Sequence, residues 1–360
     1  MADPLEFFLA GVLVVAIIAY ALLGGADFGG GMWDLFAFGP RSRQQREVID
    51  KAIGPIWEAN HVWLILLLVV SFTAFAPAFS AIMTALNIPL TVALVGIVLR
   101  GAAFIFRRYG SHQENVYRGW SRVFGVASLV TPFTLGICLA AVATGKIRLQ
   151  NGVVNTGFFA GWTTPFALAC GAFALGLFAF LAATYLTLEA RENPALQNDF
   201  RLRALLSGLM LAPLAALVFA LASAGAPYVF AGLTSWWAPP LLIATSAFSI
   251  ATLISLWTRR FRLARITAIA QVSLILLGWG LAQYPFFLVP DLTIAQAAAP
   301  VTTLTWLAGA LVVGFIILIP SLFYLFYIFK RTQSPFAPGV RSADTMESPD
   351  HQESEPSNVV

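Results

Sequence analysis

The chain has 360 residues, of which 59% are hydrophobic and only 11% are charged, and its formal net charge is +4. Soluble domains carry about 25% charged residues, so this composition excludes an ordinary soluble protein. The two cysteines, Cys138 and Cys170, lie inside apolar runs and form no CxxC motif, so neither a structural disulfide nor a thiolate metal site is expected.

Nine apolar stretches approach or exceed the roughly 20 residues that a membrane-spanning helix needs. They cover residues 6–25, 56–76, 81–106, 121–144, 158–187, 204–224, 238–257, 266–284 and 304–329. The sequence therefore predicts an all-α polytopic membrane protein with nine transmembrane helices in a single membrane domain, residues 1–332. The remaining segment, 333–360, is rich in Ser, Pro and Glu and is predicted to be a disordered cytoplasmic tail.

Basic residues gather in every second loop between these stretches, whereas the opposite side holds only Lys146 and Arg148. The positive-inside rule then places the N-terminus outside and the C-terminus in the cytoplasm, and it explains the net charge without nucleic acid. Residues 43–53 carry apolar side chains at helical spacing, which predicts a short amphipathic helix on the inner surface. On the outer side, Asp291 is expected to cap a short turn.

A polar cluster, GPIWEANHVW at residues 54–63, begins the second apolar stretch. Lipid does not tolerate such side chains unless neighbouring helices cover them or they border water. The glycine-rich end of the first stretch contributes Asp27, and Arg100 lies on the third stretch roughly 9 Å inside Phe106, at 1.5 Å per residue. Asp27, Glu58 and Arg100 are therefore expected to converge in the inner third of one bundle.

Two interpretations of this cluster stay open. In the first, the charges are a structural ion pair between helices, or Arg100 snorkels to the interface. In the second, they line a proton route, since Asp, Glu and His within membranes commonly relay protons. Glu58 and His61 could then share a hydrogen bond, Trp57 could stack on His61, and Asn60 would add an amide.

Haem and metal binding by this chain are not expected. A six-coordinate haem needs two axial ligands, usually His or Met. Only His61 lies in an apolar stretch, because His112 is in a loop and His351 is in the tail. No His, Cys or carboxylate pair has metal-ligand spacing.

Three motifs resemble subunit II of cytochrome bd-type quinol oxidases, including the cyanide-insensitive type. Residues 25–31, GADFGGG, are similar to that family's glycine-rich turn after helix 1. Residues 53–64, IGPIWEANHVWL, resemble its Pro-x-Trp-(Asp/Glu)-x-Asn-x-Val-Trp-Leu signature. Leu99-Arg100-Gly101 with Phe104 resembles its helix 3 motif, and the likeness extends over all nine stretches.

The resemblance implies two four-helix bundles, at about 6–144 and 158–284, with a peripheral ninth helix at about 304–329. It also implies a heterodimer in the bacterial cytoplasmic membrane, in which subunit I carries haems b and d and the quinol-oxidising loop. Subunit II would support that partner and contribute to cytoplasmic proton uptake for O2 reduction to water, without being catalytic alone. Some members host a structural quinone, and a small single-helix accessory subunit, quinol and membrane lipid are further expected partners.

Within this resemblance, Asp27, Trp57, Glu58, Asn60 and Arg100 match family positions, whereas the role of His61 is a local inference. The chain departs from the family in two places. Gly24 stands where an additional acid is common, and Ile105 occupies the place of a carboxylate in the family's proposed proton channel.

An isoleucine cannot carry a proton. Either water and Glu58 suffice, or His61 takes up the role, or protons enter through subunit I. A transporter or channel with a buried Asp/Glu/Arg cluster is the alternative from another class, and a subunit that serves assembly alone is a third hypothesis.

Overall fold

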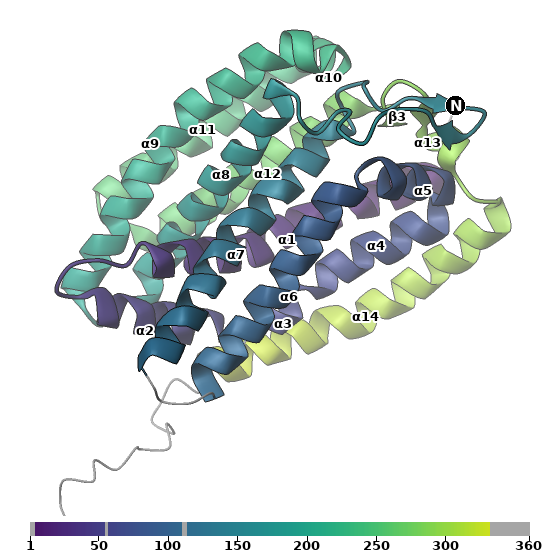
Figure 1. Ribbon diagram of the computed structural model, residues 1–360. Helices are drawn as coiled ribbons and strands as arrows, with labels where there is room; N and C mark the ends of the chain where they lie inside the picture. Colours follow the sequence, from purple (N-terminus) through teal and green to yellow (C-terminus); the bar gives the residue numbers. More distant parts are fainter. Residues whose placement is uncertain (1–3, 55–56, 110–113, 332–360) are drawn as a thin grey trace, which may run out of the picture. The chain divides into compact units, whose positions relative to one another are not determined.

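The structure is a computed structural model that describes residues 4–54, 57–109 and 114–331. In this part of the chain, nine helical segments are long and apolar enough to cross a membrane (Figure 1). They are α1 (Pro4–Leu35), α3 with α4 (Trp57–Asn60 and Val62–Ala74), α6 (Asn87–Tyr109), α7 (Glu114–Ala141), α8 (Pro165–Glu189), α9 (Pro194–Gly225), α11 (Ala238–Trp257), α12 (Phe261–Gln283) and α14 (Val301–Arg331). The predicted number of spans is confirmed for these residues. The predicted tail at 333–360 and His112 lie outside the described residues.

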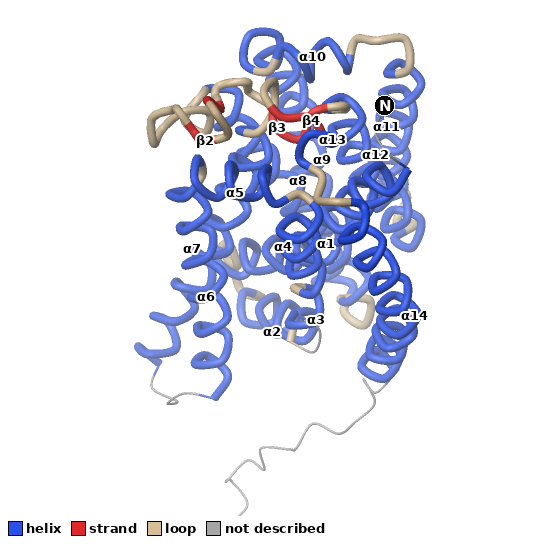
Figure 2. The backbone as a smooth tube through the Cα atoms, turned by 90° about the vertical axis from the view of Figure 1, so that its right-hand side faces the viewer, coloured by secondary structure: helices blue, strands red, loops and turns tan. Residues whose placement is uncertain are grey.

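Short elements connect the spans (Figure 2). Four are helices: α2 (Ser42–Ile53), α5 (Ala76–Ala85), α10 (Pro227–Leu233) and α13 (Ile294–Ala297). Four are strands that pair as antiparallel hairpins: β1 (Leu149–Gln150) with β2 (Val153–Val154), and β3 (Phe286–Leu288) with β4 (Leu292–Thr293). Helix α2 confirms the amphipathic helix predicted at 43–53, and its place on the inner surface stays a prediction.

Helix α1 lies at the centre of the compact unit that ends at Ile317. It packs against α4 and α7 from the first half of the chain and against α8 and α12 from the second. Its buried residues, among them Tyr20, Phe28 and Met32, join those of α8 and α12 in one hydrophobic core. The division into two four-helix bundles stays a prediction. The remainder of α14, residues 318–331, continues as a regular helix outside this unit.

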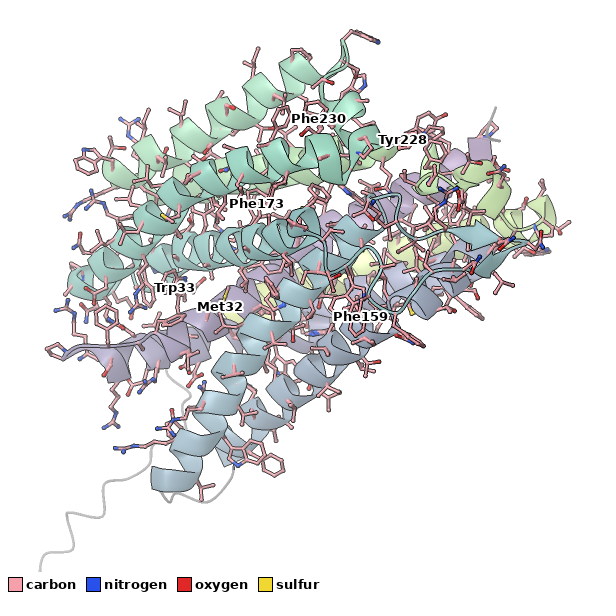
Figure 3. All side chains as sticks on the ribbon, turned by 45° about the horizontal axis from the view of Figure 1, so that its top comes forward. Met32, Trp33, Phe159, Phe173, Tyr228 and Phe230 are labelled. Atoms are coloured by element: carbon pink, nitrogen blue, oxygen red, sulfur yellow. The ribbon has the colours of Figure 1, made fainter. Side chains whose placement is uncertain are left out.

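The prediction that the first helix ends in its glycine run is wrong, because α1 continues unbroken to Leu35. Each glycine inside a helix costs about 1 kcal/mol in propensity, and close packing offsets that cost here. A Cβ on Gly25 would lie 2.6 Å from the Phe178 ring of α8, and one on Gly29 would collide with the Phe178 carbonyl. Beyond the glycines lies Trp33, whose side chain is labelled in Figure 3. Trp33 donates from Nε1 to the carbonyl of Ala179 on α8 at 2.8 Å.

Three other predicted bounds also change. The second span turns at His61, where the His61 amide bonds the Glu58 carbonyl at 3.1 Å, the tighter spacing of a 3₁₀ turn. The third stretch is two helices, α5 and α6, separated at Leu86. The fifth span begins at Pro165 instead of 158, because Thr164 caps it by accepting a hydrogen bond from the amide of Ala167.

Asp291 does not cap a turn, contrary to the sequence-based expectation. Thr293 is the N-cap of α13 and forms a capping box with Gln296. Asp291 instead accepts hydrogen bonds from Arg148 Nε at 2.9 Å and from the Leu149 amide at 2.7 Å. It thereby joins the β1–β2 hairpin to the β3–β4 hairpin, a contact 142 residues apart in sequence.

Asp291→Asn is expected to destabilise this hairpin junction slightly at neutral pH. Burial raises the pKa of the Asp291 carboxyl, but the Arg148 and Leu149 hydrogen bonds and the Arg148 charge together hold that pKa below its ordinary value. A carboxyl with a depressed folded-state pKa stabilises the fold above its unfolded pKa, about 4, and loses that contribution as pH falls through the folded-state value. Thermal unfolding of both proteins at pH 7 and near pH 3 checks this. A difference that persists undiminished at acidic pH would contradict it.

Candidate functional site

A buried polar cluster joins α1, α3, α6 and α7. Asp27, Asn60 and Arg100 are all buried. Asn60 Nδ2 donates to Asp27 Oδ2 at 2.7 Å. Arg100 donates from Nη2 to the backbone carbonyl of Asp27 at 3.0 Å and from Nε to Ser128 Oγ at 3.2 Å. The cluster lies well inside the span, because Asp27 precedes the end of α1 at Leu35 by about 12 Å at 1.5 Å per residue.

Aromatic rings enclose the Arg100 guanidinium. Its Cζ atom lies 4.8 Å from the centroid of Phe28 and 5.1 Å from that of Phe124. Both rings are fully buried. Cation–π attraction is strongest where water is excluded, so these rings stabilise a charge that the helix interior would otherwise disfavour.

His61 lies beside this cluster, and its ring is held by backbone and aromatic contacts. His61 Nδ1 is 2.9 Å from the carbonyl oxygen of Trp57. Because a carbonyl only accepts, the Nδ1 atom must carry a proton in this hydrogen bond. Tyr20, Phe28 and Trp57 surround the imidazole edge-on, with ring centroids 6.0, 6.4 and 6.0 Å away. The predicted stacking of Trp57 on His61 is therefore an edge contact.

Glu58 does not converge with Asp27 and Arg100. It is exposed on α3, while Asn60, two residues later, faces the interior. Residues two apart on a helix do not share a face, so the inward turn of Asn60 sends Glu58 outward. Among the described residues, the Glu58 carboxylate forms no side-chain hydrogen bond with His61. Ile105 on α6 is likewise exposed.

A second polar cluster, not predicted from the sequence, reaches α2 and consists of Asp34, Asp50 and Arg107. Arg107, which directly follows the third apolar stretch of the sequence, is buried. Its Nη1 atom donates to Asp34 Oδ2 at 2.8 Å, and its Nη2 atom bonds Asp50 Oδ1 on α2. The signal was present in the sequence: Asp34 follows Asp27 by seven residues and Arg107 follows Arg100 by seven, which places each pair on one helical face.

His61 engages the Trp57 carbonyl through Nδ1 and is enclosed by aromatic rings, and Met210 is exposed on α9. That this chain binds no haem stays a prediction. In the described ranges, no group of three or more His, Cys, Asp or Glu side chains could hold a metal ion. Cys138 and Cys170 are free thiols.

The fold and the cluster define a polytopic membrane protein with titratable groups enclosed by its helices. A family model described as cytochrome bd terminal oxidase subunit II matches residues 5–329. The chain belongs to this family. It is one subunit of a respiratory oxidoreductase and a multi-pass protein of the bacterial inner membrane. This assignment replaces the transporter or channel alternative.

Individual relatives agree with the family. The chain is 23% identical over 330 residues to a putative cytochrome bd menaquinol oxidase subunit II of Bacillus subtilis, covering 88% of this chain and 92% of that one. It is 26% identical over 179 residues to cytochrome bd-I ubiquinol oxidase subunit 2 of Escherichia coli, covering 49% and 46%. The bd oxidase structure from Geobacillus thermodenitrificans shares the fold, with a TM-score of 0.73, 23% identity and coverage of 92% and 100%.

Proposed function

We propose that this chain is the haem-free subunit II of a bd-type quinol:O2 oxidoreductase. In this role it supports a subunit I that carries haems b and d, and it contributes to proton uptake from the cytoplasm for O2 reduction to water. Family membership supports the oxidase, and two relatives carry the words menaquinol and ubiquinol in their names. Quinol, membrane lipid, a structural quinone and a small single-helix accessory subunit belong to the proposal as further ligands and partners.

The observation that supports the proton role is that two polar residues of α3 face in different directions. Glu58 is exposed on this short helix, while Asn60 is buried and donates to the Asp27 carboxylate. Glu58 is thus available to water or to a partner surface, and Asp27 lies behind it in the helix interior. In the proposed route Glu58 is the main carrier nearest subunit I, and Asp27 is a carrier in the helix interior beside the fixed charge of Arg100.

The chemistry of each side chain follows from its protonation behaviour. Carboxylates take up and release protons, whereas a guanidinium stays protonated and an amide only orients its neighbours. Arg100 therefore supplies a fixed positive charge, Asn60 holds the Asp27 carboxylate in place, and the acids carry the protons. His61 could carry a proton at Nε2, since Nδ1 is engaged by the Trp57 carbonyl.

Glu58→Gln in the complete oxidase is expected to lower O2 consumption and membrane-potential generation by roughly 10²-fold, the lower end of what a positioned proton-transferring side chain contributes. The visible haem spectrum should stay unchanged, because Glu58 is exposed and outside the packed core. Glu47→Gln is the matched control, since Glu47 is an exposed acid on α2 that pairs with Arg43 four residues away on the same helix.

Full turnover of the Glu58→Gln enzyme with an intact haem spectrum would remove Glu58 from the mechanism. Loss of the haem spectrum would instead favour a subunit that serves assembly alone. The oxidase assignment has its own test: the chain purified with its native partners should show reduced b- and d-type haem bands and a second membrane subunit, whereas a colourless, solitary protein would contradict it.

A further inference from the structure

Two arginine–aspartate contacts repeat along α1 and α6, and we call them the ladder. Arg100 bonds the backbone carbonyl of Asp27, and Arg107 forms a salt bridge with the Asp34 carboxylate. Asp34 lies about 10 Å from Asp27 along α1, and Arg107 lies the same distance from Arg100 along α6, at seven residues each. The Asp34–Arg107 pair is also attached to α2, because Arg107 bonds both Asp34 on α1 and Asp50 on α2. The ladder therefore leads from the end of the molecule near α2 toward the Asp27 cluster.

Asp34 is an unusual carboxylate for a purely structural ion pair. Its side chain is only 1% exposed, and its Oδ1 atom has no hydrogen-bond partner among the described residues. A buried polar atom left unsatisfied costs about 1–3 kcal/mol, so such an atom calls for an explanation. Asp50, the other partner of Arg107, has a side chain that is 38% exposed. The contacts of Arg107 thus reach solvent at Asp50. On the other side they reach Asp34, whose Oδ1 atom is buried without a hydrogen-bond partner among the described residues.

The Ser128 hydroxyl lies beside Gly31, between Asp27 and Asp34 along α1. A Cβ on Gly31, which stands between Asp27 and Asp34 on α1, would collide with Ser128 Oγ. The Ser128 hydroxyl accepts from Arg100 and donates to the Phe124 carbonyl at 2.7 Å. The Phe124 ring contacts both guanidiniums, with its centroid 5.1 Å from Arg100 Cζ and 4.7 Å from Arg107 Cζ. The Ser128 hydroxyl is thus a polar group beside the stretch of α1 that separates Asp27 from Asp34.

We propose that Asp34 is a proton-transfer residue, which takes protons from the Asp50 side and passes them toward Asp27, with Arg107 as its positioning residue. This inference rests on the proposed role of the chain in proton uptake. It supplies a carboxylate next to the turn of α6 that carries Ile105, whose aliphatic side chain cannot take part.

The transfer changes only O–H bonds. A hydronium ion on the Asp50 side gives its proton to Asp34 Oδ1 and becomes water, Asp34 becomes a neutral carboxylic acid, and Arg107 keeps its charge. The acid then releases this proton to a water molecule on the Ser128 side and returns to the carboxylate. The charged groups facing Asp34 are Arg107 from α6, and Asp50 and Arg46 from α2, with Arg46 Nε 3.4 Å from the Asp34 carbonyl.

The test uses the complete oxidase carrying Asp34→Asn, which keeps the shape and an oxygen for Arg107 but cannot carry a proton. Fully reduced enzyme is mixed with O2, and proton uptake is followed with a pH-sensitive dye in H2O and in D2O. We expect uptake to slow by roughly 10²-fold, with a larger solvent isotope effect and an unchanged haem spectrum. Asp34→Glu should restore most of the rate, because the carboxylate returns.

Asp199→Asn is the matched control. Asp199 also holds α2, through Arg41 at 2.6 Å and Gln45 at 3.0 Å, but it lies outside the ladder. Its loss should leave proton uptake unchanged.

The possible results separate this inference from the proposed function. Normal uptake in Asp34→Asn together with slow uptake in Asp27→Asn would overturn the role of Asp34 alone. Normal uptake in Asp27→Asn, Glu58→Gln and Asp34→Asn would reject proton uptake through this chain altogether. If Asp34→Asn does not assemble, Asp50→Asn decides: slow uptake supports the inference, and unchanged uptake overturns it.

Discussion

Arg100→Met is expected to destabilise the protein by about 3–5 kcal/mol, because removing one charge from a buried cluster leaves the other uncompensated. Arg100 is buried, bonds Asp27 and Ser128, and lies between two aromatic rings. Methionine fills part of the volume but offers neither a charge nor a donor. The thermal midpoint of the purified oxidase and the yield of haem-containing complex measure the effect.

A second substitution separates charge from packing. Arg100→Met combined with Asp27→Asn should recover part of the lost stability, since the uncompensated carboxylate is gone while the packing defect remains. A double variant as unstable as the sum of both single variants would show that the two charges do not interact. Arg100→Lys should fall between wild type and Arg100→Met, because an ammonium keeps the charge but lacks the planar fork that reaches both acceptors.

Gly29→Ala is expected to cost about 1–3 kcal/mol, as overpacking of a tight interior does. The new methyl group would collide with the carbonyl of Phe178, a backbone atom that cannot swing away, so α1 and α8 must separate. Because α1 packs against α4, α7, α8 and α12, the shift would spread through the core. The thermal midpoint of the assembled oxidase measures the loss.

Gly11→Ala is the matched control on the same helix. Apart from the adjoining backbone of α1, no atom of the described residues lies within 4 Å of a Cβ at Gly11. The substitution should therefore be neutral or stabilising by up to about 1 kcal/mol through helix propensity. Equal effects of the two substitutions would contradict the assignment of Gly29 to a close helix contact. A smaller loss is expected for Gly25→Ala, where the obstacle is the Phe178 ring, a side chain that can turn.

The membrane spans could be predicted from the sequence because the bilayer imposes a length and a polarity on each of them. The ends of the helices could not, since tertiary packing decides them. Glycines after Leu23 indicate a helix end by propensity, but α8, α7 and α2 press against this part of α1 and keep it helical. The same contacts place Asp27 well inside the helix, where the sequence analysis had put it at the inner end.

The meeting of Asp27 and Arg100 followed from helix depth alone, because both positions are fixed by the rise per residue. The outward turn of Glu58 did not, since it depends on which face of the short helix α3 packs inward. A cation that follows an apolar stretch, as Arg107 does, usually lies at the membrane interface. The burial of Arg107 depends on two acids from distant segments, Asp34 and Asp50. Partners so far apart in sequence can be recognised only by comparing spacings, as with the seven residues between Asp27 and Asp34 and between Arg100 and Arg107.

The most direct test of proton uptake through this chain is electrical. In the proposed function, purified oxidase in lipid vesicles, reduced and then exposed to O2 in a single turnover, should generate a membrane potential as protons move from the cytoplasmic side to the site of O2 reduction. In Asp27→Asn and Glu58→Gln enzymes with intact haem spectra, we predict that this potential rises much more slowly than in wild type. A rise as fast as in wild type in both variants would contradict a proton route through the buried cluster.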